Sequence, residues 1–140
     1  MRAEAEAAHL RVLALDYGSA RCGCAVSDPT GTIVTPLPHV ERPSSKRGMA
    51  ALRALVRERE PERVLIGLPL TLSGGDSEQT RETRRFAAML VRQLGPGVPV
   101  ELYDERFTTR LAQRDEGALA SEDSRAAAHL LEGWLGAQSR

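Results

Sequence analysis

The sequence is poor in several residue types, and each shortage narrows the class of protein. Lys46 is the only lysine among 19 basic residues, and 19 acidic residues balance them, so the chain carries no net charge. Composition alone therefore gives no sign of a nucleic-acid binder. Arginine contacts phosphate bidentately, so local arginine groups still matter. Two such groups are Arg81, Arg84, Arg85 and Arg106, Arg110, Arg114, for which solvated helix faces with neighbouring glutamates are the alternative.

Long apolar runs and cysteine pairs are also scarce. No apolar run approaches the roughly 20 residues of a membrane span, and residues 1–10 lack the apolar stretch of a secretory signal, so we expect a cytoplasmic protein without membrane partners. Cys22 and Cys24 are too close in sequence for an easy disulfide and supply only half of a zinc site. Their spacing predicts two small buried residues on one face of a strand.

Hydrophobic period and turn residues predict one α/β domain over residues 11–140, preceded by an extension over residues 1–10. Three short strands joined by tight turns come first, followed by helices and strands in alternation. This order predicts a five-stranded mixed sheet, three antiparallel strands and then two parallel ones, flanked by helices. The expected strands are 12–16, 23–27, 32–36, 64–66 and 98–103, and the expected helices follow residue 45 and span 78–94 and 122–135.

Acidic residues fall at the carboxyl ends of the predicted strands, where ligands bind in such sheets. Asp16 ends an apolar strand, and Asp104 and Glu105 follow another. For these two, a loop acid pair with one member bridged to Arg106 is the alternative. Asp123 shares a helical face with four apolar residues, Ala126, Ala127, Leu130 and Trp134, which predicts that it points toward the sheet. The alternative for Asp123 is a first-turn acid that complements the helix dipole behind an N-cap at Ser121.

Acids from two strand ends and one helix face, if brought together, form a site of oxygen ligands for a hard cation. Mg²⁺ or Mn²⁺ suits such a shell, because the remaining ligands are water and phosphate oxygens. Phosphodiester hydrolysis by metal-activated water is the chemistry that this set supports.

Four motifs in order resemble the YqgF/RuvX family. They are residues 15–19 (LDYGS) with Arg21 and 23–28 (GCAVSD), then 66–70 (IGLPL), then 104–109 (DERFTT), and Asp123-Ser124 before two alanines. Members are RNase H-like and carry the names of Holliday-junction resolvases or of nucleases for precursor 16S ribosomal RNA. The resemblance implies Asp16, Glu105 and Asp123 as catalytic metal ligands, with Asp104 as the alternative to Glu105, and phosphate contacts from Arg21, Arg106 and Thr108.

The predicted function is thus a divalent-metal-dependent endonuclease acting on branched DNA or precursor rRNA. Symmetric resolution of a junction needs two active sites, so that role predicts a homodimer. One alternative is a non-catalytic nucleic-acid-binding or regulatory module with the same fold. Another is a nucleotide-dependent phosphotransferase, because Asp16 to Ser19 also resembles the first phosphate loop of actin-like ATPases. Those proteins need two such domains, which 140 residues cannot hold.

Overall fold

The computed structural model describes residues 10–107 and 121–138, so the expected extension lies outside the described residues except for Leu10. The predicted order of three strands followed by alternating helices and strands is confirmed. A single 3₁₀ turn, η2 (Glu105–Phe107), follows the fifth strand. The strands are β1 (Val12–Asp16), β2 (Arg21–Ser27), β3 (Val34–Glu41), β4 (Arg63–Leu68) and β5 (Val100–Asp104), and the helices are α2 (Lys46–Arg59), α3 (Glu78–Leu94) and α4 (Glu122–Gln138).

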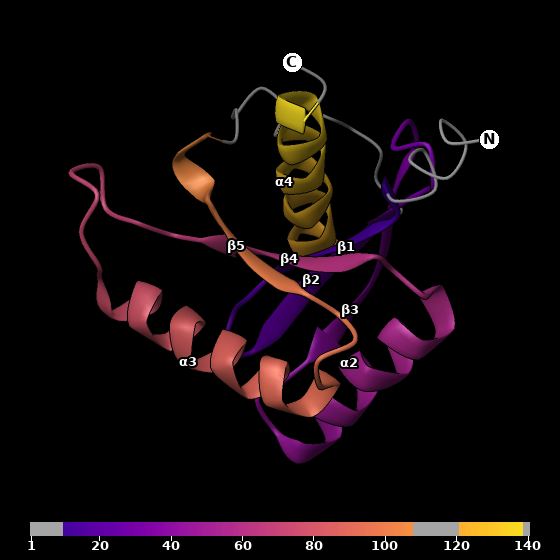
Figure 1. Cartoon of the computed structure of the whole chain (residues 1–140). Helices are drawn as coiled ribbons and strands as arrows, with labels where there is room; N and C mark the ends of the chain where they lie inside the picture. The colour runs from indigo at the N-terminus through magenta and orange to yellow at the C-terminus, as the bar shows by residue number, and fades with distance from the viewer. Residues whose placement is uncertain (1–9, 108–120, 139–140) are drawn as a thin grey trace.

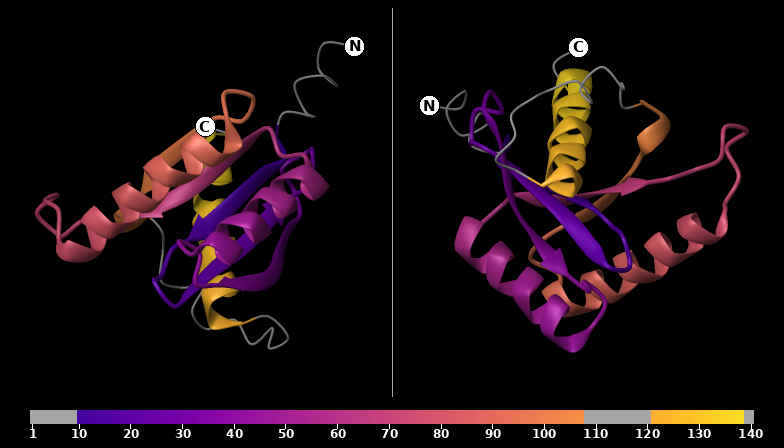
Figure 2. Two further views of the ribbon diagram at one scale, coloured as in Figure 1. Left: turned by 90° about the horizontal axis from the view of Figure 1, so that it is seen from below. Right: turned by 180° about the vertical axis from the view of Figure 1, so that it is seen from behind.

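The five strands form one mixed sheet in the order β3-β2-β1-β4-β5. β2 is antiparallel to both β1 and β3, whereas β4 and β5 run parallel to β1. Figures 1 and 2 show α2 and α3 on one face of the sheet and α4 on the other. The predicted α/β fold with a mixed sheet is therefore confirmed.

β1 is the central strand, and its side chains alternate between two covered faces. Leu13 and Leu15 are fully buried in the cluster that includes residues of α2 and α3. Val12 and Ala14 are fully buried in the cluster formed with α4. A strand covered on both sides needs a continuous apolar run, which explains the composition of β1. The same alternation places Asp16 on the α4 face, directly beyond the apolar segment.

The two cysteines occupy β2 as predicted. Both are fully buried in one cluster, and neither forms a disulfide. A hydrogen bond between Cys22 and Cys24, together with burial, holds the pKa of the Cys22 thiol well above its usual range. Cys22 is therefore a packed thiol and not a reactive thiolate.

β3 begins two residues later and ends five residues later than predicted. The Asp28 carboxylate explains the late start. Its Oδ1 accepts hydrogen bonds from the backbone N–H groups of Thr32 at 2.9 Å and Ile33 at 2.8 Å. Local side-chain bonds of this kind hold the backbone in a turn and keep it out of the strand ladder.

The predicted inward face of the last helix is partly wrong, because Ala126 is exposed. The Ser124 hydroxyl accepts a hydrogen bond from the Cys24 N–H at 3.2 Å, which centres the packed face on Ser124. Asp123 lies at the margin of that face, with 34% of its side chain exposed. The buried residues of α4 are Ser124, Ala127, Ala128, Leu130, Leu131 and Trp134. None of the helices in the described part of the chain is long and apolar enough to cross a membrane.

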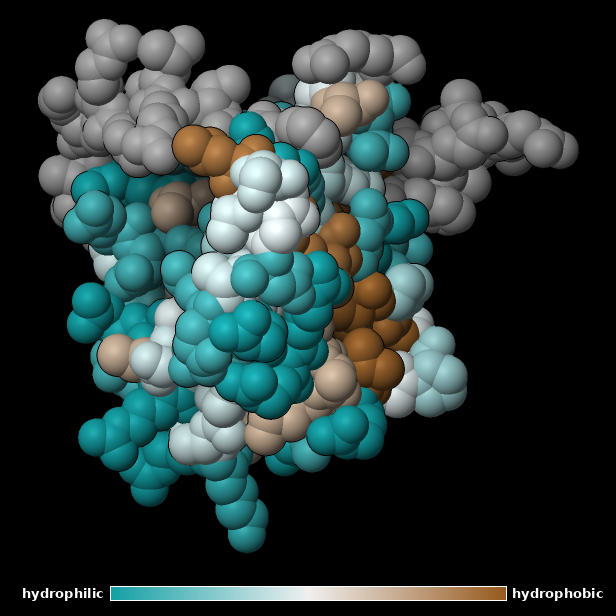
Figure 3. All heavy atoms as spheres, turned by 90° about the vertical axis from the view of Figure 1, so that its left-hand side faces the viewer, coloured by the Kyte–Doolittle hydropathy of each residue, from teal (hydrophilic) through white to brown (hydrophobic). Residues whose placement is uncertain are grey.

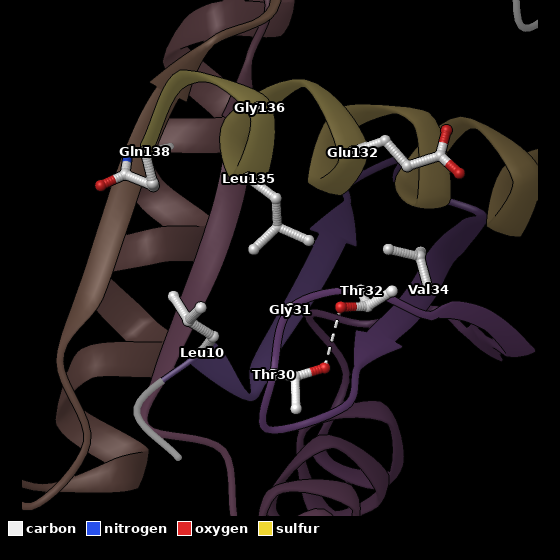
Figure 4. Close-up of a pocket in the computed structure, with 9 residues that line it drawn as sticks. All are labelled: Leu10, Thr30, Gly31, Thr32, Val34, Glu132, Leu135, Gly136 and Gln138. Atoms are coloured by element: carbon white, nitrogen blue, oxygen red, sulfur yellow. Dashed lines mark hydrogen bonds between the residues drawn. The ribbon is translucent and has the colours of Figure 1, made fainter. Parts of the chain in front are cut away.

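A groove lies at the opposite end of β1 from Asp16, between the β2–β3 turn and the C-terminal end of α4 (Figure 4). Leu10 and Leu135 point toward one another across it. Among the described residues that line it, Glu132 is the one ionisable residue. The candidate acids lie at the other end of the sheet, where β1 ends at Asp16.

Candidate functional site

Asp16 and Glu105 meet at the edge where the parallel strands end. Asp16 is the last residue of β1, and Glu105 begins η2 directly after β5. Their side chains are hydrogen-bonded to each other. The contact spans β4, which lies between the two strands in the sheet.

Gly67 in β4 makes this contact possible. A Cβ at Gly67 would lie 2.8 Å from Oε2, 2.9 Å from Cγ and 3.1 Å from Cδ of Glu105. The Glu105 side chain therefore lies directly over the Gly67 backbone on its way to Asp16. A glycine inside a strand often marks such a close approach.

Asp104 is oriented differently from its neighbour Glu105. Its Oδ2 accepts a hydrogen bond from Arg106 Nη2 at 2.6 Å, and this contact holds the pKa of Asp104 below its usual value. Arg106 Nη1 also donates to the backbone carbonyl of Leu72 at 3.1 Å. Asp104 thus forms the predicted alternative, an acid bridged to Arg106, and Glu105 is the acid that contacts Asp16.

Asp123 reaches the same edge from α4. Gly23 of β2 is the register partner of Asp16. A Cβ at Gly23 would lie only 1.9 Å from the carbonyl oxygen of Asp123, so the first turn of α4 rests on the Gly23 backbone. Ser121 accepts a hydrogen bond from the Ser124 N–H at 3.2 Å, as the predicted N-cap does. The Asp123 carboxylate is bound by Arg21, with Nε 2.8 Å from Oδ2.

The crowding of negative charge changes the protonation of Asp16. Burial raises the pKa of Asp16 from 3.8 to about 7, with further contributions from the charge of Glu105, the charge of Asp123 and the hydrogen bond to Glu105. Burial also raises the pKa of Glu105, and the charge of Asp104 adds to it, whereas the hydrogen bond from Asp16 opposes the rise. A clustered set of carboxylates that is costly to ionise is one that a bound cation would stabilise.

The donor set matches a hard divalent cation in chemistry, although the ligands are not assembled. Within the described residues, no group of three or more histidine, cysteine, aspartate or glutamate side chains is arranged to hold a metal ion as it stands. Two carboxylates, Asp16 and Glu105, are in contact, and Asp123 is engaged by Arg21. Mg²⁺ needs few carboxylates because water and phosphate complete its shell. The residues therefore fit such an ion once Asp123 turns from Arg21.

The arginines named as phosphate contacts are both ion-paired. Arg21 pairs with Asp123, and Arg106 pairs with Asp104. The remaining arginines and threonine of that part of the sequence, Thr108, Arg110 and Arg114, lie outside the described residues.

The arginines of α3 also have acidic partners. Arg84 pairs with Asp76 at 2.9 Å, and Arg81 and Arg85 pair with Glu78 at 2.9 and 3.5 Å. The face of the molecule seen from the side of the 71–77 loop is mostly hydrophilic, with a hydrophobic strip and a smaller, separate hydrophobic group (Figure 3). For this group of arginines, a solvated helix face with acidic neighbours is thus the observed arrangement.

Sequence reasoning missed the two glycines that shape the site. Gly23 and Gly67 each lie within a strand and against the backbone or side chain of a candidate acid. It also missed Tyr17, which follows Asp16, stacks on Phe86 of α3 at a ring distance of 4.5 Å and hydrogen-bonds Ser44 at 3.2 Å. The signal for the glycines was present, because glycine weakens a strand unless something approaches it closely.

Comparison with known proteins gives relatives over nearly the whole chain. A protein of Koribacter versatilis is 43% identical over 111 residues, covering 79% of this chain and 71% of that protein. A protein of an Anaeromyxobacter species is 39% identical over 134 residues, covering 90% and 96%. Both carry the name "Putative pre-16S rRNA nuclease".

A solved structure gives the fold, and a family profile gives the family. RuvC of Thermus thermophilus, in complex with a Holliday junction substrate, superposes with a TM-score of 0.65 at 15% identity, covering 94% of this chain and 96% of that one. At that identity the likeness establishes the fold, which is the RuvC-like RNase H fold. The profile of the RuvX family, described as Holliday junction resolvase, matches residues 10–137. Fold, motif order and relatives together show that this chain belongs to the RuvX (YqgF) family.

Proposed function

We propose that this chain is a divalent-metal-dependent endonuclease that hydrolyses phosphodiester bonds in structured nucleic acid. The observation that carries the proposal is the contact between Asp16 and Glu105 at the carboxyl edge of the sheet, within reach of the charge of Asp123. The family profile, described as Holliday junction resolvase, matches residues 10–137 and favours a nuclease over a phosphotransferase.

Each acid has a distinct part in this proposal. Asp16 and Glu105 would hold Mg²⁺ or Mn²⁺ between β1 and η2, and Asp123 would join them from α4. When bound, the metal supplies an activated water and neutralises charge on the phosphate. Gly67 keeps Glu105 in place, and the stacking of Tyr17 on Phe86 fixes the chain directly after Asp16.

Arginines at the same edge would position the substrate. Arg106 is held by Asp104 and by the Leu72 carbonyl, so its guanidinium has a fixed place between η2 and the 71–77 loop. Arg21 begins β2 beside Asp123. We assign both to phosphate contact, together with Thr108.

Precursor 16S rRNA is the substrate that we favour, because the relatives at 39–43% identity are named for it. Junction DNA is the second candidate, because the family description names it. Symmetric junction cleavage needs two active sites and hence a homodimer, whereas trimming an rRNA end needs one.

Labelled four-way DNA junctions and a precursor-rRNA fragment, incubated side by side with Mg²⁺, Mn²⁺ or EDTA, test this proposal. We expect metal-dependent cutting of the RNA that EDTA abolishes. Cutting of the junction alone, by a protein that sediments as a dimer, would select the resolvase function. Binding of either substrate without any cutting would instead identify a non-catalytic nucleic-acid-binding module.

Replacing Glu105 with Gln should lower the cleavage rate by about 100-fold, because a metal ligand loses its charge and such charge stabilisation is worth several kcal/mol. The neighbouring isosteric change Asp104→Asn is the matched control. It weakens the ion pair with Arg106, in which the Asp104 side chain is 16% exposed, but it removes no charge from the proposed metal ligands, so we expect a loss within about ten-fold. Initial rates at saturating Mg²⁺ distinguish the two. A larger loss in Asp104→Asn would reverse the assignment of the two acids.

Replacing Gly67 with Ala should reduce cleavage by about ten-fold or more while thermal stability changes little. The new Cβ would displace the Glu105 side chain, which can move, and no backbone atom is within its closest contacts. Gly75→Ala is the control, because its nearest contact is Thr71 Oγ1 at 3.5 Å, an ordinary packing distance. Equal rates for both variants would show that the position of Glu105 is unimportant.

A further inference from the structure

Arg21 forms an ion pair with Asp123, whose carboxylate completes the proposed metal site. Its Nε donates to Asp123 Oδ2 at 2.8 Å, and the two residues are 102 positions apart in the chain. The packing of α4 on Gly23 fixes their approach, because Gly23 lies two residues after Arg21 in β2. The ion pair is therefore built by the contact of α4 with β2 and not by a chance meeting of long side chains.

The pair is also weak enough to open. The side chains of Arg21 and Asp123 are 54% and 34% exposed, and exposed ion pairs contribute little net stability. Glu41 and Glu122 lie close enough for their charges to act on Arg21. The guanidinium thus keeps acidic neighbours when Asp123 turns away, and its side chain has room to move in solvent.

A guanidinium and a divalent cation compete for the same carboxylate oxygens. We propose that Arg21 is an internal competitor that holds Asp123 away from the metal, and that metal binding at Asp123 frees the Arg21 guanidinium for a substrate phosphate. Metal binding and nucleic-acid binding then favour each other, because each takes one partner of the same ion pair. Arg21 acts as a positioning residue in this scheme. The inference rests on the proposed metal-dependent function.

The experiment titrates metal alone into intact protein. Mn²⁺ is added to wild type and to Arg21→Gln at pH 8, without nucleic acid, and binding is followed by calorimetry. We expect Arg21→Gln to bind Mn²⁺ about two- to five-fold more tightly, the range that an exposed ion pair supports. The same variant should show a raised KM for nucleic acid and a salt dependence of binding reduced by about one phosphate contact. A residue that served substrate binding alone would leave Mn²⁺ affinity unchanged.

A double-mutant cycle separates competition from a general effect of charge. In an Asp123→Asn background, Arg21→Gln should no longer tighten Mn²⁺ binding, because the contested carboxylate is absent. Tightening that persists in that background would show that Arg21 acts through space, and unchanged or weaker binding by Arg21→Gln alone would also overturn the inference. If neither wild type nor Arg21→Gln binds Mn²⁺, the proposed function fails together with it. Thermal melts confirm that each variant is folded.

Discussion

An Asp16→Asn protein is expected to lose about 10³-fold or more of its metal-dependent cleavage. Asp16 is the acid on which the charges of Glu105 and Asp123 converge, so its replacement removes the centre of the proposed cation site. Several kcal/mol of charge stabilisation are lost with it, and each 1.36 kcal/mol corresponds to a factor of ten in rate. Gel-based cleavage of the preferred substrate in Mg²⁺ measures the loss. Residual cutting within ten-fold of wild type would exclude Asp16 from catalysis.

The same substitution should stabilise the metal-free protein at alkaline pH. Asp16 has a pKa of about 7 in the folded protein and 3.8 as its ordinary value, so folding favours the protonated form. The stabilisation of the folded state by protonated Asp16 is fully present below about pH 4 and is lost as the pH rises through 7. Asp16→Asn removes the penalty of ionisation. At pH 8 in EDTA it should therefore be more stable than wild type by about 2–4 kcal/mol, or roughly 5–10 °C in Tm.

Melting curves at pH 4.5 and pH 8 test the sign of this effect. The advantage of Asp16→Asn should be small at pH 4.5 and large at pH 8. Asp28→Asn is the control, and it should lower stability by a similar amount at both pH values, because the hydrogen bond from the Thr30 hydroxyl and those from backbone N–H groups lower the pKa of Asp28 to about 2. The stability from Asp28 is present above about pH 4 and is lost as the pH falls through 2. A difference between Asp16→Asn and wild type that is the same at both pH values would show that ionisation of Asp16 is not its cause.

Mn²⁺ should reverse the advantage of Asp16→Asn at pH 8. In wild type, Mn²⁺ and a proton compete for the Asp16 carboxylate, and the proton competes less at pH 8 than at pH 6. Mn²⁺ should therefore raise Tm more at pH 8 than at pH 6. This dependence on pH should disappear in Asp16→Asn, which lacks the competing proton. The loss of activity and the gain of metal-free stability would then have one physical origin, a carboxylate placed where only a cation makes its charge favourable.

The helices could be predicted most accurately because each one combines an apolar period with a capping residue. The expected range 78–94 coincides with α3, where Ser77 caps the helix and shares a capping box with Thr80. The predicted ends of the strands were less accurate, because the alternation of apolar and polar residues does not reveal where a side chain hydrogen-bonds the backbone. The Asp28 carboxylate delays β3 in this way.

The meeting of Asp16 with an acid that follows β5 could be expected from the strand ends, whereas the choice between the adjacent acids Asp104 and Glu105 could not. The chain leaves β5 and enters the η2 turn at Glu105, so strand alternation no longer tells which way each side chain points. The structure turns Asp104 to Arg106 and Glu105 to Asp16. The pairing of Arg21 with Asp123 joins distant parts of the chain, and no local pattern indicates it.

At Gly23, the residue type that a buried strand prefers differs most from the residue type that tertiary packing allows. It lies in a buried strand, where a β-branched residue would ordinarily be preferred. A Cβ there would lie 1.9 Å from the carbonyl oxygen and 2.2 Å from the carbonyl carbon of Asp123, and 2.8 Å from the Ser124 nitrogen. These are backbone atoms of a packed helix, which cannot move aside as a flexible side chain can. The approach of α4 to β2 therefore requires glycine at this position.

Replacing Gly23 with Ala should consequently destabilise the protein by about 3 kcal/mol or more, which is at the upper end of the range for overpacking. The first turn of α4 has to lift, which breaks the bond from the Cys24 N–H to Ser124 and carries Asp123 away from Asp16. Thermal or urea unfolding measures the loss. Gly133→Ala in α4 is the matched control. Its Cβ meets no atom within 4 Å in the described part of the chain, so the same change should stabilise the helix by about 0.5–1 kcal/mol. Similar effects from the two substitutions would show that close packing at Gly23 does not hold α4 in place. Opposite signs would show that the contact of α4 with the Gly23 backbone is part of what stabilises the fold.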